Sequence, residues 1–105
     1  MTAVTESSIV FIAPAKIPTD KQWYGFLLSK WLKGDTIVSV VWSFLDKDGV
    51  VTTDLTLVQQ AIGAVNTSAT VQIKDGVSQS TYTVLGKVTT ILGNIKTFGF
   101  ILQVI

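Results

Sequence analysis

The 105-residue sequence has no cysteine, no histidine and no arginine. Without cysteine, disulfide scaffolds, zinc ribbons and thiol nucleophiles are excluded. Without histidine, the commonest general base and the commonest transition-metal ligand are missing. Without arginine, the planar fork that reads phosphates and guanine edges is missing as well. These absences point away from catalysis and from metal or cofactor binding.

Charge of either sign is scarce, because only 14% of the residues are charged and the net charge is +1. The eight lysines are scattered from Lys16 to Lys96, whereas a nucleic-acid site clusters them on one face. We therefore expect no nucleic-acid partner. The mean hydropathy of +0.51 also excludes a disordered chain, which needs low hydrophobicity and high charge.

Long apolar runs are missing too. The longest are short, such as Ile37–Val41 and Phe98–Leu102, whereas a membrane span needs about 20 apolar residues. The stretch Met1–Glu6 lacks the basic and apolar pattern of a signal peptide, so we expect synthesis in a cytoplasm and no membrane partner. The length fits one domain, which we place at residues 8–105 after an N-terminal arm of residues 1–7.

Segments with the composition of β-strands recur between turn residues. The expected strands are Ser8–Ala13, Trp23–Leu28, Thr36–Phe44, Val50–Val58, Ala69–Lys74, Thr81–Leu92 and a last strand in which Phe98, Phe100, Leu102 and Val104 share a face. In Thr81–Leu92, we expect Tyr82, Val84, Gly86 and Val88 to face inward. Two prolines exclude a regular element over Pro14–Asp20. Helical turns are expected only at Ser29–Lys33 and Val58–Ile62. About seven strands at this spacing predict a sandwich or a barrel.

Two aromatic residues favour an immunoglobulin-like sandwich. Tyr82 opens the penultimate strand, where such folds have a tyrosine whose hydroxyl binds the preceding loop, although Tyr82 also fits a plain core aromatic. Trp42 lies in the middle of the central strand and fits the buried tryptophan of these folds. The predicted fold is an all-β, immunoglobulin-like β-sandwich of about seven antiparallel strands.

The acidic and hydroxyl residues do not form a recognisable catalytic set. Asp46-Lys47-Asp48-Gly49 has the spacing that begins a calcium loop, but the later ligands are missing and a hairpin turn fits better. Asp35 is expected to organise the turn Gly34-Asp35-Thr36 through its own hydrogen bonds. A serine nucleophile would need a base, and the chain has no histidine. We therefore expect a protein that is not an enzyme and has no small-molecule substrate.

Two strands are apolar on both faces, which is more than one core requires. In the last strand, Ile101 and Ile105 lie on the face opposite the core. In the strand Thr36–Phe44, we assign Ile37, Ser39 and Val41 to that outer face and Val38, Val40, Trp42 and Phe44 to the other face. A half-buried strand of an isolated sandwich has polar residues on its outer face. The surplus predicts either cover by the region Trp23–Lys33 or burial against another subunit.

The order of several motifs resembles a family of small virion proteins of tailed bacteriophages, the fibre–tail adaptor proteins. The resemblance runs from about Lys16 onward and is most specific in Trp31-Leu32-x-Gly34-Asp35-Thr36-Ile37, followed by Trp42. The other matching positions are Lys16-x-Pro18-x-Asp20, Tyr24, Ala69-Thr-Val71-x-Ile73, Tyr82-Thr-Val84 and Phe100-x-Leu102-x-Val104. The resemblance implies an immunoglobulin-like structural protein of the tail or neck, present in several copies and linking the tail to fibres.

The expected partners are other virion proteins (tail, neck or fibre subunits) and copies of the chain itself. We predict two partner-binding regions: the outer face of the last strand, through Ile101 and Ile105, and the aromatic residues Trp23, Tyr24, Phe26 and Trp31. The arm Met1–Thr5 is small and polar, and it fits either a segment that lies over a neighbouring subunit or a disordered end. Two other functions stay open: a capsid decoration protein, and a carbohydrate-binding module of a host-recognition fibre.

Overall fold

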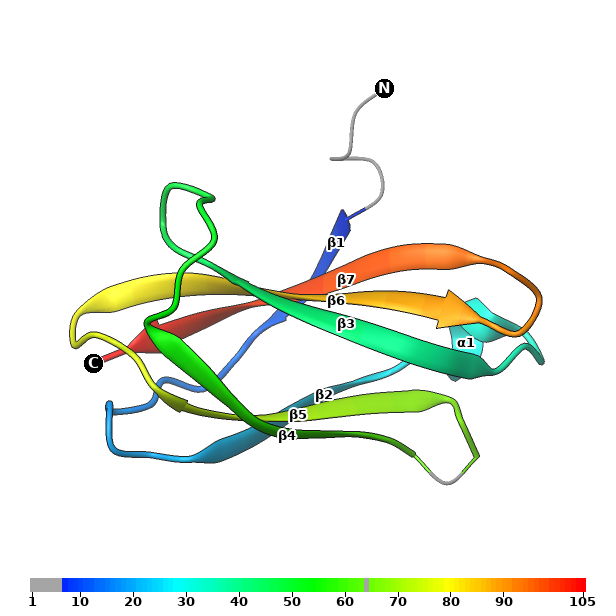
Figure 1. Cartoon of the computed structure of the whole chain (residues 1–105), viewed down its shortest axis with the longest axis horizontal. Helices are drawn as coiled ribbons and strands as arrows, with labels where there is room; N and C mark the ends of the chain where they lie inside the picture. The colour runs from blue at the N-terminus through cyan, green and yellow to red at the C-terminus, as the bar shows by residue number, and fades with distance from the viewer. Residues whose placement is uncertain (1–6, 64) are drawn as a thin grey trace.

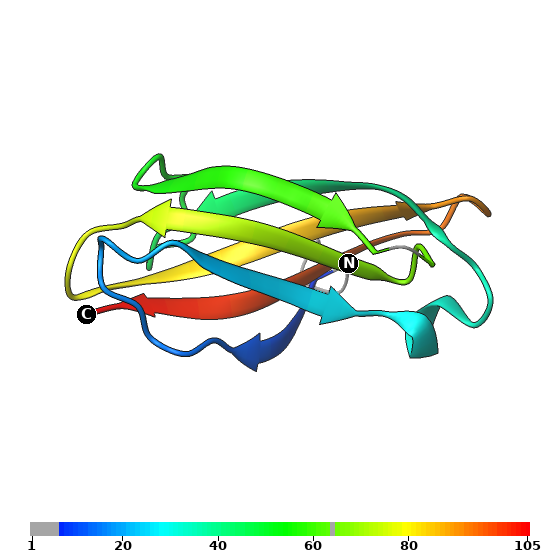
Figure 2. The same ribbon diagram turned by 90° about the horizontal axis from the view of Figure 1, so that it is seen from below.

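A computed structural model describes residues 7–63 and 65–105. Two β-sheets face each other, as Figures 1 and 2 show from two directions. The strands are β1 (Ser7–Ile12), β2 (Gln22–Leu27), β3 (Ile37–Leu45), β4 (Leu55–Ile62), β5 (Ser68–Asp75), β6 (Ser80–Thr90) and β7 (Ile95–Val104). One sheet has the order β1-β7-β6-β3 and the other the order β2-β5-β4. The predicted all-β, immunoglobulin-like sandwich is confirmed.

The short helix α1 (Ser29–Leu32) lies between β2 and β3, where a helical turn is expected at Ser29–Lys33. Among the described residues, no helix is long and apolar enough to cross a membrane. Most of the predicted N-terminal arm, including Met1–Thr5, lies outside the described residues, and its last residue, Ser7, begins β1.

The expectation of purely antiparallel strands is wrong at one edge, because β1 pairs with β7 in parallel. The chain leaves β1 through Pro14 and crosses to the other sheet before it forms β2, so no tight hairpin forces β1 to run antiparallel to a neighbour. The pairing continues beyond β1. The amide of Ala13 donates to the carbonyl of Ile101, and the amide of Lys16 donates to that of Gln103.

The core fills the space between the sheets with alternate side chains of their inner faces. In β7, Phe98, Phe100, Leu102 and Val104 are buried as predicted, and in β6 the inward residues are Tyr82, Val84, Gly86 and Val88. The ring of Phe26 stacks on that of Trp42 with centroids 5.7 Å apart. A Cβ at residue 86 would lie 3.0 Å from the Trp42 ring, so the glycine makes room for this aromatic pair.

A β-bulge in β3 changes which residues face the core. Ile37 pairs with Thr90 and Ser39 with Thr89, so Val38 is an extra residue in the strand. The face assigned to Ile37 and Val38 is therefore wrong: Ile37 is buried and Val38 is exposed. Beyond the bulge the expected alternation holds, and Val40, Trp42 and Phe44 pack against the core.

The fourth strand begins and ends later than expected. β4 spans Leu55–Ile62, so the predicted strand Val50–Val58 is shifted and the helical turn predicted at Val58–Ile62 is wrong. A bulge between Leu57 and Gln59 interrupts the alternation of inward and outward side chains, so the sequence lacks the regular pattern of a strand here. Val50 and Val51 instead belong to a turn, in which Val51 forms an isolated bridge to Leu45.

Tyr82 forms the tyrosine corner that its position suggests. Its hydroxyl accepts a hydrogen bond from the amide of Val77 at 2.9 Å and donates one to Asp54 Oδ2 at 3.0 Å. The ring itself is almost completely buried. The residue therefore fastens the connection between β5 and β6, and the residue before β4, to the core.

Candidate docking surfaces

The residues predicted to bind partners fall into two groups in the structure. Tyr24 and Phe26 are 9% and 2% exposed, so their side chains belong to the core and are not available to a partner. Trp23 points to the opposite face of β2, with 48% of its side chain exposed, because neighbouring residues of a strand point to opposite faces. Ile105 is also exposed, whereas Ile101 and Trp31 are half-buried.

Ile101 is one member of an apolar row across the outer face of the four-stranded sheet. In the strand register, Leu45 pairs with Thr83, Thr83 with Ile101, and Ile101 with Ile12. Leu85 and Val41 lie on the same face, one and two rows away. We call Ile12, Val41, Leu45, Leu85 and Ile101 the outer apolar row. Ile12 and Val41 are 75% and 62% exposed, so within the described residues this face lacks cover.

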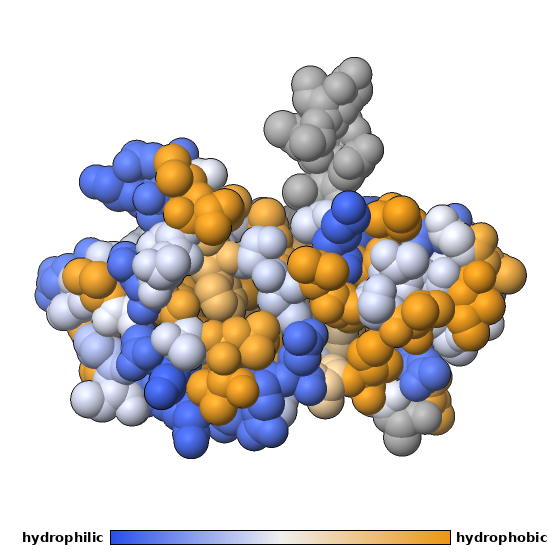
Figure 3. Space-filling model, viewed as in Figure 1, coloured by the Kyte–Doolittle hydropathy of each residue, from blue (hydrophilic) through white to orange (hydrophobic). Residues whose placement is uncertain are grey.

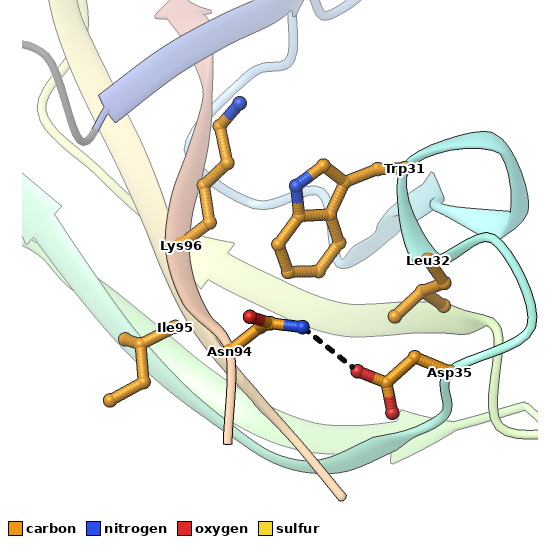
Figure 4. Close-up of a pocket in the computed structure, with 6 residues that line it drawn as sticks. All are labelled: Trp31, Leu32, Asp35, Asn94, Ile95 and Lys96. Atoms are coloured by element: carbon orange, nitrogen blue, oxygen red, sulfur yellow. Dashed lines mark hydrogen bonds between the residues drawn. The ribbon is translucent and has the colours of Figure 1, made fainter. Parts of the chain in front are cut away.

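A second surface lies at the end of the sandwich that contains α1, at the right in Figure 1. We call it the α1 end; it is formed by α1 and by the connections β4–β5 and β6–β7. A pocket of about 330 Å³ lies there. Figure 4 shows its lining residues, which come from α1 on one side and from the start of β7 on the other. The indole of Trp31 packs edge-on against the ring of Phe98, with centroids 5.2 Å apart. Lys96 Nζ lies 5.4 Å from the centre of the Phe98 ring.

The carboxylate of Asp35 is the polar centre of this end. It accepts hydrogen bonds from the amide of Thr36 at 2.8 Å, from the amide of Leu92 at 3.3 Å and from Asn94 Nδ2 at 3.3 Å. The first bond stays within the predicted Gly34-Asp35-Thr36 turn, and the other two reach across to the β6–β7 turn. Asp35 therefore does more than its sequence context predicts, because it connects two loops that are far apart in the chain.

The hydrogen bonds keep Asp35 ionised. Burial raises the pKa of its carboxyl, but the hydrogen bonds from Thr90, Thr36, Leu92 and Asn94 lower it further, so the net pKa lies below the ordinary aspartate value. Because several hydrogen bonds hold the carboxylate, its two acceptor oxygens keep fixed directions. The backbone of the β6–β7 turn is fixed with it.

The β6–β7 turn presents apolar side chains on this fixed backbone. Ile91, Leu92 and Ile95 are 67%, 75% and 58% exposed. Two further hydrogen bonds hold this backbone. The amide of Ile91 donates to the carbonyl of Thr36, and the amide of Asn94 donates to Thr90 Oγ1. The sequence interpretation took Thr81–Leu92 as one strand and missed this tip. The available signal was two large aliphatic residues directly before Gly93-Asn94.

The opposite end, at the left in Figure 1, is formed by the connections β1–β2, β3–β4 and β5–β6. It holds five of the six aspartates of the sequence, namely Asp20, Asp46, Asp48, Asp54 and Asp75, together with the lysines Lys16, Lys21, Lys47 and Lys74. The aspartates outnumber the lysines by one, and we call it the acidic end. Asp46 Oδ1 accepts hydrogen bonds from the amides of Asp48 and Val50, so the calcium-like motif is the hairpin turn that the sequence favours.

A buried lysine also belongs to the acidic end. Lys16 is 1% exposed, and its Nζ donates to the backbone carbonyls of Ile17 and Asp75 at 2.9 and 2.5 Å. Burial lowers its pKa, while the charges of Asp20 and Asp75 raise it; the net pKa is lower than that of an ordinary lysine. Lys16 therefore ties the β1–β2 connection to the end of β5.

The fold and these surfaces define an immunoglobulin-like structural domain with exposed apolar surface at one end and over one sheet. Over residues 16–103 the chain matches the family described as the podophage GP4 fiber-tail adaptor protein gp77. The chain therefore belongs to this family of phage fibre–tail adaptor proteins, and the predicted resemblance is confirmed. The search of curated proteins found no significant match.

Proposed function

We propose that this chain is a non-enzymatic structural adaptor that joins the tail or neck of a phage particle to its fibres through protein–protein contacts. Membership of the fibre–tail adaptor family supports the tail as its place in the particle. The proposal includes contacts with copies of itself and synthesis in the cytoplasm of a bacterial host.

The observation that carries the proposal is the outer apolar row. Ile12 and Val41 expose most of their side chains next to the half-buried Leu45, Leu85 and Ile101. A monomer gains nothing from apolar side chains exposed together on one face of a sheet, whereas a partner that covers them gains about 25 cal/mol for each Å² of apolar surface removed from water. We assign Ile101 to this docking surface, and Ile105, Trp23 and Trp31 to further contacts.

The substitution Ile101→Lys tests this assignment, and Gln103→Lys is its matched control. Both place a lysine on the outer face of β7, but Gln103 is exposed and lies outside the outer apolar row. In phage particles assembled with the variant chain, we expect Ile101→Lys to yield a folded protein that is lost from the tail, and Gln103→Lys to be retained. Circular dichroism of each purified variant establishes that it is folded.

The position of the chain in the assembled particle, determined by cryo-electron microscopy, tests the adaptor role itself. A ring of copies between tail and fibres supports the proposal. Copies spread over the capsid would replace it with a decoration role, and a chain only at the fibre tips would replace it with host recognition. If Ile101→Lys fails to fold, Ile101 is a structural residue and the docking surface is elsewhere.

A further inference from the structure

The tip of the β6–β7 turn has the properties of a preorganised docking element. Ile91 and Leu92 are adjacent, both are more than two-thirds exposed, and the Asp35 carboxylate fixes the backbone that carries them. A side chain presented from a fixed backbone loses little conformational entropy when it is buried in an interface. The element is therefore suited to insertion into an apolar recess on a partner.

The charges around this tip restrict the partner. The exposed charged side chains described at the α1 end are lysines: Lys30 and Lys33 on or next to α1, with the half-buried Lys96 nearby. The one carboxylate there, Asp35, is buried and accepts hydrogen bonds within the chain. An anionic partner surface is therefore favoured, and a cationic one is repelled.

The acidic end of the same chain has the complementary properties. Asp46, Asp48 and Asp54 line a hollow of about 290 Å³ in which Lys47 is the one cationic side chain. Beside it, Val50 and Val51 are 59% and 73% exposed. In Figure 3 this β3–β4 turn forms an apolar group at the upper left, and further apolar surface gathers toward the α1 end on the right.

We propose that the chain binds a second copy of itself head to tail, with the α1 end of one copy seated on the acidic end of the next. Leu92 and Ile91 would then pack on Val50 and Val51, and Lys30 and Lys33 would face Asp46 and Asp48. The inference deepens the proposed function and rests on it, since it names a copy of the chain as one partner of the adaptor. Such a contact joins two different surfaces, so it is repeated from copy to copy into a ring or a row.

Charge reversal at each end, followed by mixing, tests this arrangement. One variant carries Lys30→Glu and Lys33→Glu, which makes both of its ends anionic; the other carries Asp46→Lys and Asp48→Lys, which makes both cationic. The association constant of the full-length wild type and of each variant is measured by analytical ultracentrifugation at low ionic strength. We expect the association constant of each variant alone to be lower than that of the wild type by a factor of about ten or more.

An equal mixture of the two variants is the decisive sample. In the mixture, each cationic end meets an anionic end again, so association should return to within about threefold of the wild-type value. Lys87→Glu, an exposed position of β6 away from both ends, is the control for the change in net charge and should associate like the wild type. Raising the ionic strength from about 0.01 M to about 1 M shortens the Debye length from about 30 Å to about 3 Å, so it should weaken the self-association of the wild type.

Several outcomes would overturn the inference. A wild type that remains monomeric at the highest concentration reached, or a mixture that associates no better than its components, contradicts head-to-tail binding. Thermal unfolding of each variant excludes loss of fold as the reason. A tail ring in which neighbouring copies touch side by side would overturn this inference but leave the adaptor role intact. An end-to-end contact in solution with no copies in the tail would support this inference but contradict the adaptor role.

Discussion

Both ends of the sandwich are held by buried polar side chains, but the two ends use different groups. At the α1 end, one short carboxylate, Asp35, binds backbone amides and leaves the side chains of the β6–β7 turn in water. At the acidic end, two long side chains, Lys16 and Tyr82, bring their apolar bodies into the core and place only their polar tips on the loops. We infer that Lys16 and Tyr82 contribute more to the stability of the domain than Asp35 does, whereas Asp35 serves mainly to fix the β6–β7 turn.

Removing the buried lysine of the acidic end is expected to have the largest effect. Lys16→Ala deletes an almost fully buried chain of methylenes together with two hydrogen bonds, so it should lower the free energy of unfolding by about 3 kcal/mol. Guanidinium unfolding measures the change. The control, Lys21→Ala, removes an exposed lysine five residues away and should change the stability by less than about 0.5 kcal/mol. A similar value for both variants would contradict the structural role of Lys16.

Removing the hydroxyl of the tyrosine corner should have the next largest effect. Tyr82→Phe keeps the buried ring but leaves the amide of Val77 and the carboxylate of Asp54 without this partner, which should cost about 1.5 kcal/mol. Asp54→Asn retains an oxygen that can accept from the hydroxyl, so its cost should be smaller. Equilibrium unfolding of both variants checks the order. A larger loss for Asp54→Asn would show that the carboxylate, not the hydroxyl, holds this corner.

The charge of Asp35 should make the α1 end sensitive to acid. Because its pKa in the folded chain lies below the ordinary value of 3.8, its contribution is complete above that value and is lost as the pH falls toward the folded pKa. In Asp35→Asn this part of the pH dependence is absent, and an amide group takes the place of one acceptor opposite Asn94. We therefore expect Asp35→Asn to be less stable than the wild type at neutral pH, with a difference that shrinks in acid.

The measurement is the unfolding free energy of both proteins from about pH 2 to about pH 7. The other aspartates titrate in both chains, so the difference isolates residue 35. A difference that does not change with pH would mean that the ionised form of Asp35 has no special role in the fold.

The smallest effect on stability is expected at the tip itself. Leu92→Ser leaves the backbone bond to Asp35 intact and removes a side chain that is 75% exposed, so the stability should change by at most about 0.5 kcal/mol. The comparison variant Leu102→Ala, in the core, should lose about 3 kcal/mol. A large loss in Leu92→Ser would place this side chain in the fold rather than in docking.

Local patterns in the sequence predicted much of the fold. Alternation over β6 and β7 identified the inward residues, and the position of Tyr82 before a long strand indicated the corner that the structure contains. These features depend on neighbours in the chain, which is why a single sequence reveals them. The Asp35 turn was predicted for the same reason.

The errors arose where distant parts of the chain decide the outcome. The bulges at Val38 and Val58 fit each strand to its partner, and they shift the alternation by one residue. Treating Trp23, Tyr24 and Phe26 as one aromatic region overlooked that β2 points Trp23 away from the core and the other two into it. The parallel pairing of β1 likewise depends on a strand near the far end of the sequence.

The candidate surfaces were harder to predict than the fold. Ile101 and Ile105 were named from the alternation of one strand, but the row that Ile101 completes includes residues of β1, β3 and β6. The aspartates look scattered in the sequence, and folding gathers five of them at one end. Four of the eight lysines lie at the same end, so what folding gathers there is the aspartates and not a large excess of negative charge.

The way Asp35 holds the β6–β7 turn also bears on how this protein can evolve. At positions 91 and 92 the turn is held through backbone amides, which every residue except proline supplies, so the side chains at these two positions are not needed for the fold. Substitutions there can accumulate in a lineage of phages without loss of the domain. The proposed contact surface can thus change together with its partner while the scaffold beneath it stays the same.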